Sequence, residues 1–95
     1  KKDLKNISVL FSQKIILADW ENKVYGKKNV ISFNKKIFKK FKKINVKIIN
    51  IYENKKKRSF ACKIIVSLNG LKIKVVDLIY FNKNKEIIKI EAYKL

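Results

Sequence analysis

The segment from residue 71 to residue 82 organises the hydrophobic pattern of this chain. Its residues are mostly β-branched, aliphatic or aromatic, which favours a pleated strand whose side chains alternate between two faces. One face contains no lysine and is expected to turn toward the core; it carries Leu71, Ile73, Val75, Asp77, Ile79 and Phe81. Asp77 is out of place there, because a buried carboxylate is costly unless it is paired, hydrogen-bonded or protonated.

Similar patterns predict that this segment belongs to an antiparallel meander. Further strands are expected at residues 46–53, 60–68 and 86–95. Asn69-Gly70 separates two of them, and this pair is typical of a two-residue type I′ hairpin turn. On the last strand the alternation places Ile88, Ile90 and Ala92 toward the core and Glu91 on the opposite face.

The N-terminal half contains a hydrophobic pattern with helical spacing. Residues 30–43 are predicted to form an amphipathic helix with Asn29 as its N-cap. Its apolar stripe is Val30, Phe33, Ile37, Phe41 and Ile44, and its opposite side is rich in lysine. We interpret it as a helix that covers a sheet, in preference to a basic surface for a membrane or nucleic acid.

The residues before this helix predict three small elements. Asp3 could cap a short helix, with Leu4, Ile7, Leu10 and Phe11 along one stripe. Residues 15–20 read as a short strand on which Asp19 shares a face with Ile15 and Leu17, and residues 21–28 read as a polar loop. The whole pattern predicts one α+β domain over residues 1–95, with a strongly curved antiparallel sheet packed against helices.

The charge of +18 suggests an anionic partner at first sight. The composition favours a plainer explanation, because Arg58 is the only arginine and phosphate-binding proteins usually use more of them. The cluster from Lys55 to Arg58 contains no glycine and is interpreted as a solvated hairpin tip rather than a phosphate-binding loop. We therefore do not expect nucleic-acid binding.

Other classes of site are excluded by residues that the chain lacks. It has no histidine, and Cys62 is its single cysteine, so we expect no disulfide, no metal site and no cofactor. Cys62 is interpreted as a small buried apolar residue. No apolar run approaches membrane-spanning length, and the N-terminus has no secretion signal, so a cytoplasmic location without membrane contact is expected.

Asp19 and Asp77 stand apart from the other acids because each shares a strand face with aliphatic residues. Two carboxyl groups in one apolar cavity drive their pKa values apart, so one could act as a base while the other stays protonated and donates a hydrogen bond. The alternative is that each acid pairs with a lysine at the rim of the sheet. The residues alone leave these two readings even.

Two groups of residues resemble a known fold family. The first runs from Leu10-Phe11-Ser12 through Ala18-Asp19 to Gly26 and the following helix. The second comprises Asn69-Gly70, Val75-Val76-Asp77, Tyr80-Phe81-Asn82, Ile88-Lys89-Ile90 and Ala92-Tyr93. Together they resemble a SnoaL-like or ketosteroid isomerase-like domain of the nuclear transport factor 2-like superfamily. The resemblance implies a cone-like, cystatin-like α+β fold, here without most of its first helix.

The resemblance also implies roles for individual residues. By position, Asp19 matches the general base of the isomerase, and Asp77 matches its protonated hydrogen-bond donor. Separately from the resemblance, we expect Trp20, Phe33, Phe60, Val75 and Tyr93 to line or close the cavity, with packing in the core as the alternative role of each. Trp20 stands where the isomerase has proline, and the tyrosine of its oxyanion hole would lie on the missing helix.

Two functions follow as expectations. The first is a domain that binds an apolar small molecule, and that could act as an isomerase or cyclase with Asp19 as base and Asp77 as donor. The alternative is a non-catalytic ligand-binding or protein-interaction domain of the same fold. A homodimer through the outer face of the sheet fits both, because Val76, Leu78 and Tyr80 interrupt the lysines there.

Overall fold

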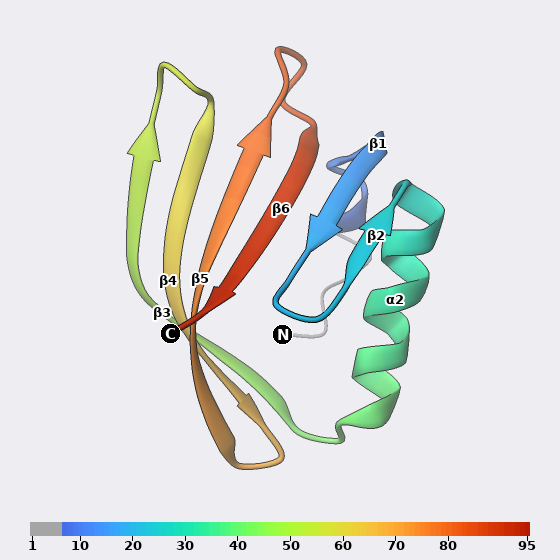
Figure 1. The fold of residues 1–95 in the computed structure, drawn as a ribbon, viewed down its shortest axis with the longest axis vertical. Helices are drawn as coiled ribbons and strands as arrows, with labels where there is room; N and C mark the ends of the chain where they lie inside the picture. The colour runs from blue at the N-terminus through green and yellow to red at the C-terminus, as the bar shows by residue number, and fades with distance from the viewer. Residues whose placement is uncertain (1–6) are drawn as a thin grey trace.

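One curved, unclosed sheet of six strands runs through the computed structural model, which describes residues 7–95 (Figure 1). The elements in chain order are β1 (Phe11–Ala18), β2 (Lys23–Tyr25), α2 (Lys27–Lys40), β3 (Ile44–Asn54), β4 (Ser59–Leu68), β5 (Leu71–Phe81) and β6 (Ile87–Lys94). The expected α+β class is confirmed. The capping role of Asp3 and the position of Leu4 lie outside the described residues.

The strand order is β2-β1-β6-β5-β4-β3, so the last strand lies between the first strand and the meander. β1 runs parallel to β6, and the other neighbouring pairs are antiparallel. The sheet is therefore mixed, which corrects the wholly antiparallel arrangement expected from sequence. Hydrophobic alternation reveals a strand but not the direction of its partner, so this pairing had no sequence signal.

The β4–β5 hairpin confirms the turn predicted from Asn69-Gly70. Both residues have the positive φ angles that a type I′ turn requires, +51° for Asn69 and +92° for Gly70. The turn is also tied to the start of β3. The Asn69 backbone N–H donates to the Lys43 carbonyl at 2.8 Å, and Asn69 Oδ1 accepts from the Lys43 N–H at 2.9 Å.

A β-bulge changes the predicted faces of β6. Tyr80 pairs with Lys89, but the next residue of β5, Phe81, pairs with Ile87, so Ile88 is the extra residue. Ile87 is consequently buried, whereas Ile88 is 37% exposed. The expectation that Ile88 faces the core was wrong, because one inserted residue inverts the alternation on one side of the bulge.

The N-terminal boundaries also differ from the sequence predictions. The first strand begins at Phe11, which was expected on a helical stripe, and the loop predicted at residues 21–28 contains β2 and the start of α2. β2 is only three residues long, too short to show an alternation. β1 ends at Ala18, so Asp19 lies just beyond the strand on which it was expected.

Helix α2 starts three residues before the predicted position and ends three residues earlier. Its N-cap is Gly26, whose φ of +87° and ψ of 147° suit a residue without a side chain. Asn29 instead lies in the first turn, where its side-chain amide donates to the Tyr25 carbonyl at 3.0 Å. The expected N-cap was wrong because glycine can make this bend through its backbone alone.

The core lies between α2 and the strands at its end of the sheet. Val30 of α2 and Ile15 of β1 are fully buried and cluster with Phe11 and Ile87. Figure 1 shows α2 beside β1 and β2, while β3 lies at the far edge of the sheet. Among residues 7–95, no helix is both long enough and apolar enough to cross a membrane.

Candidate functional site

A hollow of about 380 Å³ lies between α2 and the inner face of the sheet. Phe33, Ile37 and Phe38 line it from α2. Ile64 and Val75 line it from β4 and β5. The lining is mainly apolar, and its polar side chains are Asp19, Asn34 and Asp77. This volume is within the usual range for small-molecule sites, roughly 300–1,000 Å³.

Asp77 occupies the middle of β5, between Cys62 on β4 and Ala92 on β6. Its strand face is the predicted one, because Val75 on the same face is buried and both residues line the hollow. Within residues 7–95 the Asp77 carboxyl has no hydrogen-bond or ion-pair partner. Burial raises the pKa of Asp77 to about 6.

Asp19 lines the same hollow from the turn between β1 and β2. Its Oδ1 accepts hydrogen bonds from the backbone N–H groups of Glu21 at 2.8 Å and Asn22 at 2.6 Å. The Asp19 N–H in turn donates to the Asn22 carbonyl at 2.9 Å. Asp19 therefore shapes this turn, a role that its predicted position inside a strand did not suggest.

The structure places the two acids at one hollow, together with three of the five expected lining residues. These three are Trp20, Phe33 and Val75. Trp20 is 47% exposed, and Val75 forms part of the buried core.

Phe60 and Tyr93 lie elsewhere, which corrects the expectation that they line this hollow. Tyr93 follows Ala92 on β6, so it points to the outer face and is exposed. Phe60 is on the inner face but nearer the other end of β4, where its ring packs edge-to-face on Phe81 with centroids 5.8 Å apart.

Asn34 and Phe38 line the hollow but were not predicted. They follow the buried Val30 at intervals of four residues along α2 and therefore lie on the same side of the helix. The helical spacing could have predicted that they line the hollow. The prediction considered only the apolar stripe that contains Phe33 and Ile37, and it omitted Asn34 and Phe38 beside that stripe.

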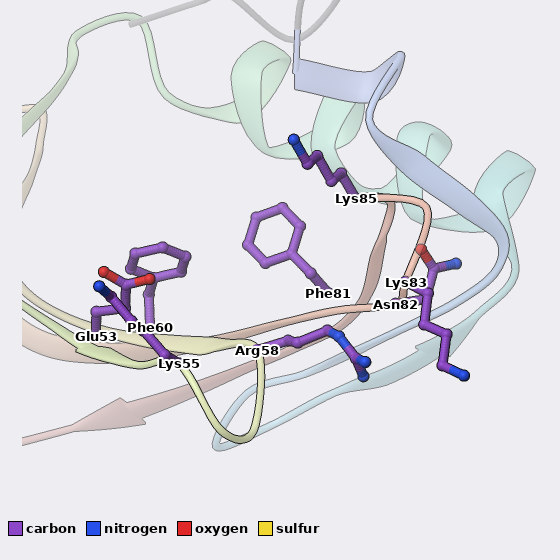
Figure 2. A pocket seen from close by; sticks show the side chains of 8 residues that line it. All are labelled: Glu53, Lys55, Arg58, Phe60, Phe81, Asn82, Lys83 and Lys85. Carbon is purple, nitrogen blue, oxygen red and sulfur yellow. The ribbon is translucent and has the colours of Figure 1, made fainter.

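A second hollow, of about 410 Å³, lies at the tips of the β3–β4 and β5–β6 hairpins. Figure 2 shows the Phe60 and Phe81 rings rising from the sheet between side chains of the two turns. Its other lining residues are Glu53, Lys55, Arg58, Asn82, Lys83 and Lys85. This hollow is distinct from the one that contains Asp77, because the two have no lining residue in common within the described part of the chain.

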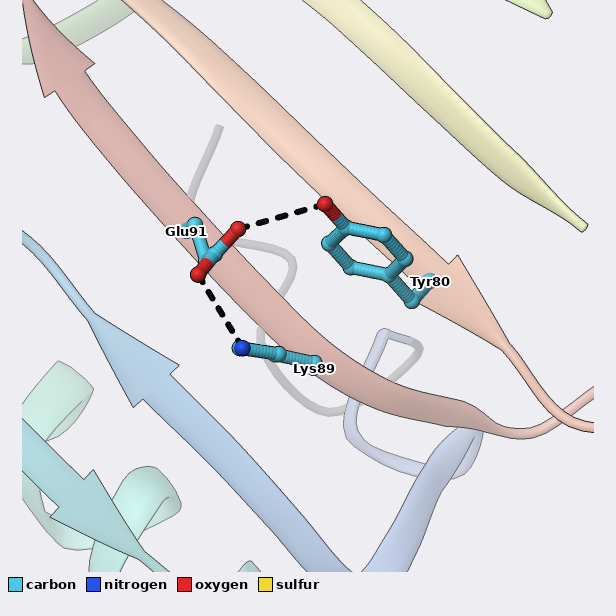
Figure 3. A network of polar contacts seen from close by, with 3 residues as sticks. All are labelled: Tyr80, Lys89 and Glu91. Atoms are coloured by element: carbon cyan, nitrogen blue, oxygen red, sulfur yellow. Dashed lines mark hydrogen bonds and ion pairs between the residues drawn. The ribbon is translucent and has the colours of Figure 1, made fainter. Parts of the chain in front are cut away.

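A polar cluster on the outer face of the sheet involves Tyr80, Lys89 and Glu91 (Figure 3). The Tyr80 hydroxyl donates to Glu91 Oε1 at 3.2 Å, and Lys89 Nζ lies 3.1 Å from Glu91 Oε2. Burial and the neighbouring Glu91 raise the pKa of Tyr80. The cluster faces away from the Asp77 hollow, so it belongs to the outer surface and not to this site.

Comparisons with known proteins show which fold this is. No family model matches the sequence, and no curated protein matches it. Among solved structures, a SnoaL-like family protein from Agrobacterium tumefaciens, proposed to be an isomerase, matches with a TM-score of 0.84 at 9% identity, over 100% of this chain and 86% of that one.

Two further structures agree with this match. A proposed SnoaL-like polyketide cyclase from Jannaschia sp. CCS1 has a TM-score of 0.83 at 13% identity, over 99% of this chain and 73% of that one. A protein with a ketosteroid isomerase-like fold from Catenulispora acidiphila, in complex with trimethylamine, has a TM-score of 0.82 at 12% identity, over 98% and 75%. At such low sequence identities, the structural similarity shows that the folds agree but does not show that the proteins share an activity. The chain therefore has the nuclear transport factor 2-like fold of SnoaL-like and ketosteroid isomerase-like proteins, as its sequence motifs predicted.

Proposed function

We propose that this domain binds a small, largely apolar molecule in the hollow beneath α2, and that protonated Asp77 donates a hydrogen bond to an acceptor on it. One observation carries the proposal: a half-buried carboxyl group without a partner among residues 7–95 faces an apolar hollow. A ligand carbonyl would give the neutral carboxyl its missing hydrogen bond.

The electrostatics of Asp77 support a neutral, polar-tipped ligand. With a pKa of about 6, Asp77 gains its proton close to neutral pH, far above an ordinary aspartate. A ligand that displaces water from the hollow would disfavour the carboxylate further and favour the protonated form. An anionic ligand head at this position would instead meet a partly ionised acid of the same sign.

The finer part of the proposal is proton-transfer chemistry, as in an isomerase or cyclase. Asp19 would act as the base: it lines the hollow, and its Oδ2 has no hydrogen bond within residues 7–95, whereas Oδ1 accepts two backbone N–H groups. It would remove a proton from carbon beside a carbonyl group, and Asp77 would stabilise the developing oxyanion. The descriptions of the Agrobacterium and Jannaschia proteins favour these two reaction classes.

Binding can be tested with 2-acetylnaphthalene, a neutral aromatic ketone, by following backbone amide shifts of the labelled protein. We expect shifts around Asp77 and α2, and an apparent affinity that falls about tenfold or more between pH 5 and pH 7.5, since only the protonated acid donates. Asp77→Asn keeps a donor, so its binding should not depend on pH. Equal affinity of the wild type at both pH values would contradict the donor role.

A second candidate is a protein-interaction domain that forms a homodimer through the outer face of the sheet. Strand pairing places Tyr52, Leu78, Val76 and Tyr93 on this face, and Tyr52 and Tyr93 are more than half exposed. Exposed aromatic and aliphatic side chains that lie together are typical of interfaces. This candidate is compatible with ligand binding, because the hollow opens on the other face.

A further inference from the structure

The hollow at the two hairpin tips combines a basic rim with an aromatic floor. Lys55 and Arg58 reach it from the β3–β4 turn, and Lys83 and Lys85 reach it from the β5–β6 turn. Among residues 7–95, Glu53 is the only acidic residue that lines it. In Figure 2 the two phenylalanine rings lie between the Lys55 and Arg58 side chains and that of Lys85, while Lys83 extends away from them.

The four cations have no partner within the described part of the chain. The ion pair found among residues 7–95 is Lys89–Glu91, and the cations over aromatic rings there are Lys23, Lys40 and Lys89. Like charges that share a rim repel one another, and an anion bound between them relieves this repulsion. The hollow is therefore electrostatically suited to a ligand of negative charge.

The backbone holds this rim in a fixed geometry. Arg58 and Lys85 both adopt left-handed conformations, with φ of +48° and +63°, which are uncommon for residues with side chains. Each closes its turn, because the Arg58 N–H donates to the Lys55 carbonyl and the Lys85 N–H donates to the Asn82 carbonyl.

Further hydrogen bonds connect and brace the two turns. The Phe81 N–H donates to the Arg58 carbonyl at 2.9 Å, which joins one hairpin tip to the other. Asn82 Oδ1 accepts from the N–H groups of Asn84 and Glu86, and Asn82 Nδ2 donates to Glu86 Oε1. The backbone of a rim held in this way loses little conformational freedom when a ligand binds.

The floor offers two aromatic rings rather than a flat aliphatic surface. The ring planes of Phe60 and Phe81 meet at 80° with centroids 5.8 Å apart, so the edge of one ring packs against the face of the other. Both side chains are only partly buried. A planar aromatic group can pack against such a pair with the offset or edge-to-face geometry that aromatic rings favour.

We propose that this basic hollow binds a small aromatic anion, an arene that carries a carboxylate, sulfonate or phosphate. The arene packs on Phe60 and Phe81, and the anionic group lies between Arg58 and Lys85. Arg58 is the only arginine of the chain, and its planar guanidinium can donate two parallel hydrogen bonds to such a group. This site is independent of the function proposed for the Asp77 hollow.

The test uses 2-naphthoate as the probe and its neutral amide, 2-naphthamide, as the comparison. With ¹⁵N-labelled protein, we expect saturable amide shifts at residues 55–60 and 81–86 on addition of 2-naphthoate. The amide should bind about tenfold more weakly or worse, since it loses the charge-assisted hydrogen bonds. The double variant Arg58→Gln/Lys85→Gln should lose about tenfold in affinity for 2-naphthoate. Both side chains are exposed, so this variant should fold normally.

The matched control is Lys35→Gln/Lys36→Gln, which removes the same charge from the exposed side of α2 and should leave 2-naphthoate binding unchanged. Asp77→Asn should leave it unchanged as well, which separates this site from the Asp77 hollow. The proposal is overturned if 2-naphthoate does not bind, if the amide binds equally well, or if the shifts centre on Asp77. An equal loss of affinity in the control variant would also overturn it, because binding would then follow net charge alone.

Discussion

Asp77 combines two properties that rarely occur together in a strand: its carboxyl is half-buried on the core face, and it has no hydrogen-bond or ion-pair partner among residues 7–95. An apolar residue at this position would complete the core face of β5. A residue that weakens the fold where a better-packed alternative exists is typical of a functional site.

This property predicts an unusual pH dependence of stability. Burial raises the pKa of Asp77 to about 6 in the folded protein, while the unfolded chain has an ordinary aspartate, so the folded state binds more protons between about pH 4 and pH 6. The contribution of Asp77 to the free energy of unfolding therefore falls as pH rises through this window and stays low above it. Asp77→Asn should stabilise the protein by about 1–3 kcal/mol at pH 7.5 and by much less at pH 4.

Urea unfolding of the two proteins at both pH values measures this difference directly. A variant that is less stable than the wild type at pH 7.5 would mean that Asp77 has a stabilising partner in solution.

Individual site residues differ in how well the sequence predicts them. Asp77 could be found from sequence because a lone acid interrupts five apolar residues on one strand face, and Asp19 was found by the same argument. The turn that Asp19 forms could not be found in this way, because it depends on where β1 ends. Tyr93 was expected to line or close the hollow, although its place beside Ala92 on a strand directs it outward.

At the scale of elements, the turn between β1 and β2 sets the position of one side of the hollow. Asp19 Oδ1 accepts two backbone hydrogen bonds there, and Trp20 at the rim is the next residue. The β1–β2 hairpin has only three residue pairs, so it depends on this turn for its register.

Two substitutions of Asp19 separate its structural role from its proposed chemical role. Asp19→Ala removes the acceptor and should lower the free energy of unfolding by about 1 kcal/mol, as loss of a comparable capping acceptor does. Asp19→Asn keeps an oxygen acceptor and should cost much less, although it cannot act as a base. Urea unfolding of the three proteins checks the order, and equal destabilisation by both substitutions would show that the carboxylate charge itself holds the turn.

Elements with a long repeating pattern were predictable, and elements defined by tertiary contacts were not. The meander from β3 to β5 and its Asn69-Gly70 turn follow from alternation and turn chemistry. β2 is too short for a pattern, and the bulge at Ile88 inserts one residue into an otherwise regular alternation. The parallel pairing of β1 with β6 joins segments about seventy residues apart, and local sequence carries no signal for it.

At the scale of the whole molecule, the two faces of the sheet differ in what they offer. The inner face carries both hollows, and the outer face carries the Tyr80–Glu91–Lys89 cluster together with exposed apolar side chains. A dimer formed through the outer face would leave both hollows accessible.

A charge placed on the outer face should therefore prevent association. We expect the wild-type protein to sediment as a dimer, and Leu78→Lys to sediment as a monomer, because a lysine at the centre of the contact would lose its hydration. The matched control is Ile48→Lys, which adds the same charge to the inner side of the exposed strand β3 and should leave the dimer intact. Dimerisation that survives Leu78→Lys, or that is lost in the control alone, would place the contact elsewhere.

The position of β6 between β1 and β5 has a consequence for how the protein assembles. The three-stranded unit β3–β4–β5 can form from neighbouring hairpins, but the sheet hydrogen bonds that attach β1 and β2 to it all pass through β6. Long-range pairing of this kind is slow, because the intervening chain must be brought together first. During synthesis the β1–β2 hairpin must therefore wait for its neighbour in the sheet, β6, which lies about seventy residues downstream. Since β6 also supplies Ile90 and Ala92, the hollow of Asp77 takes shape only at this final step.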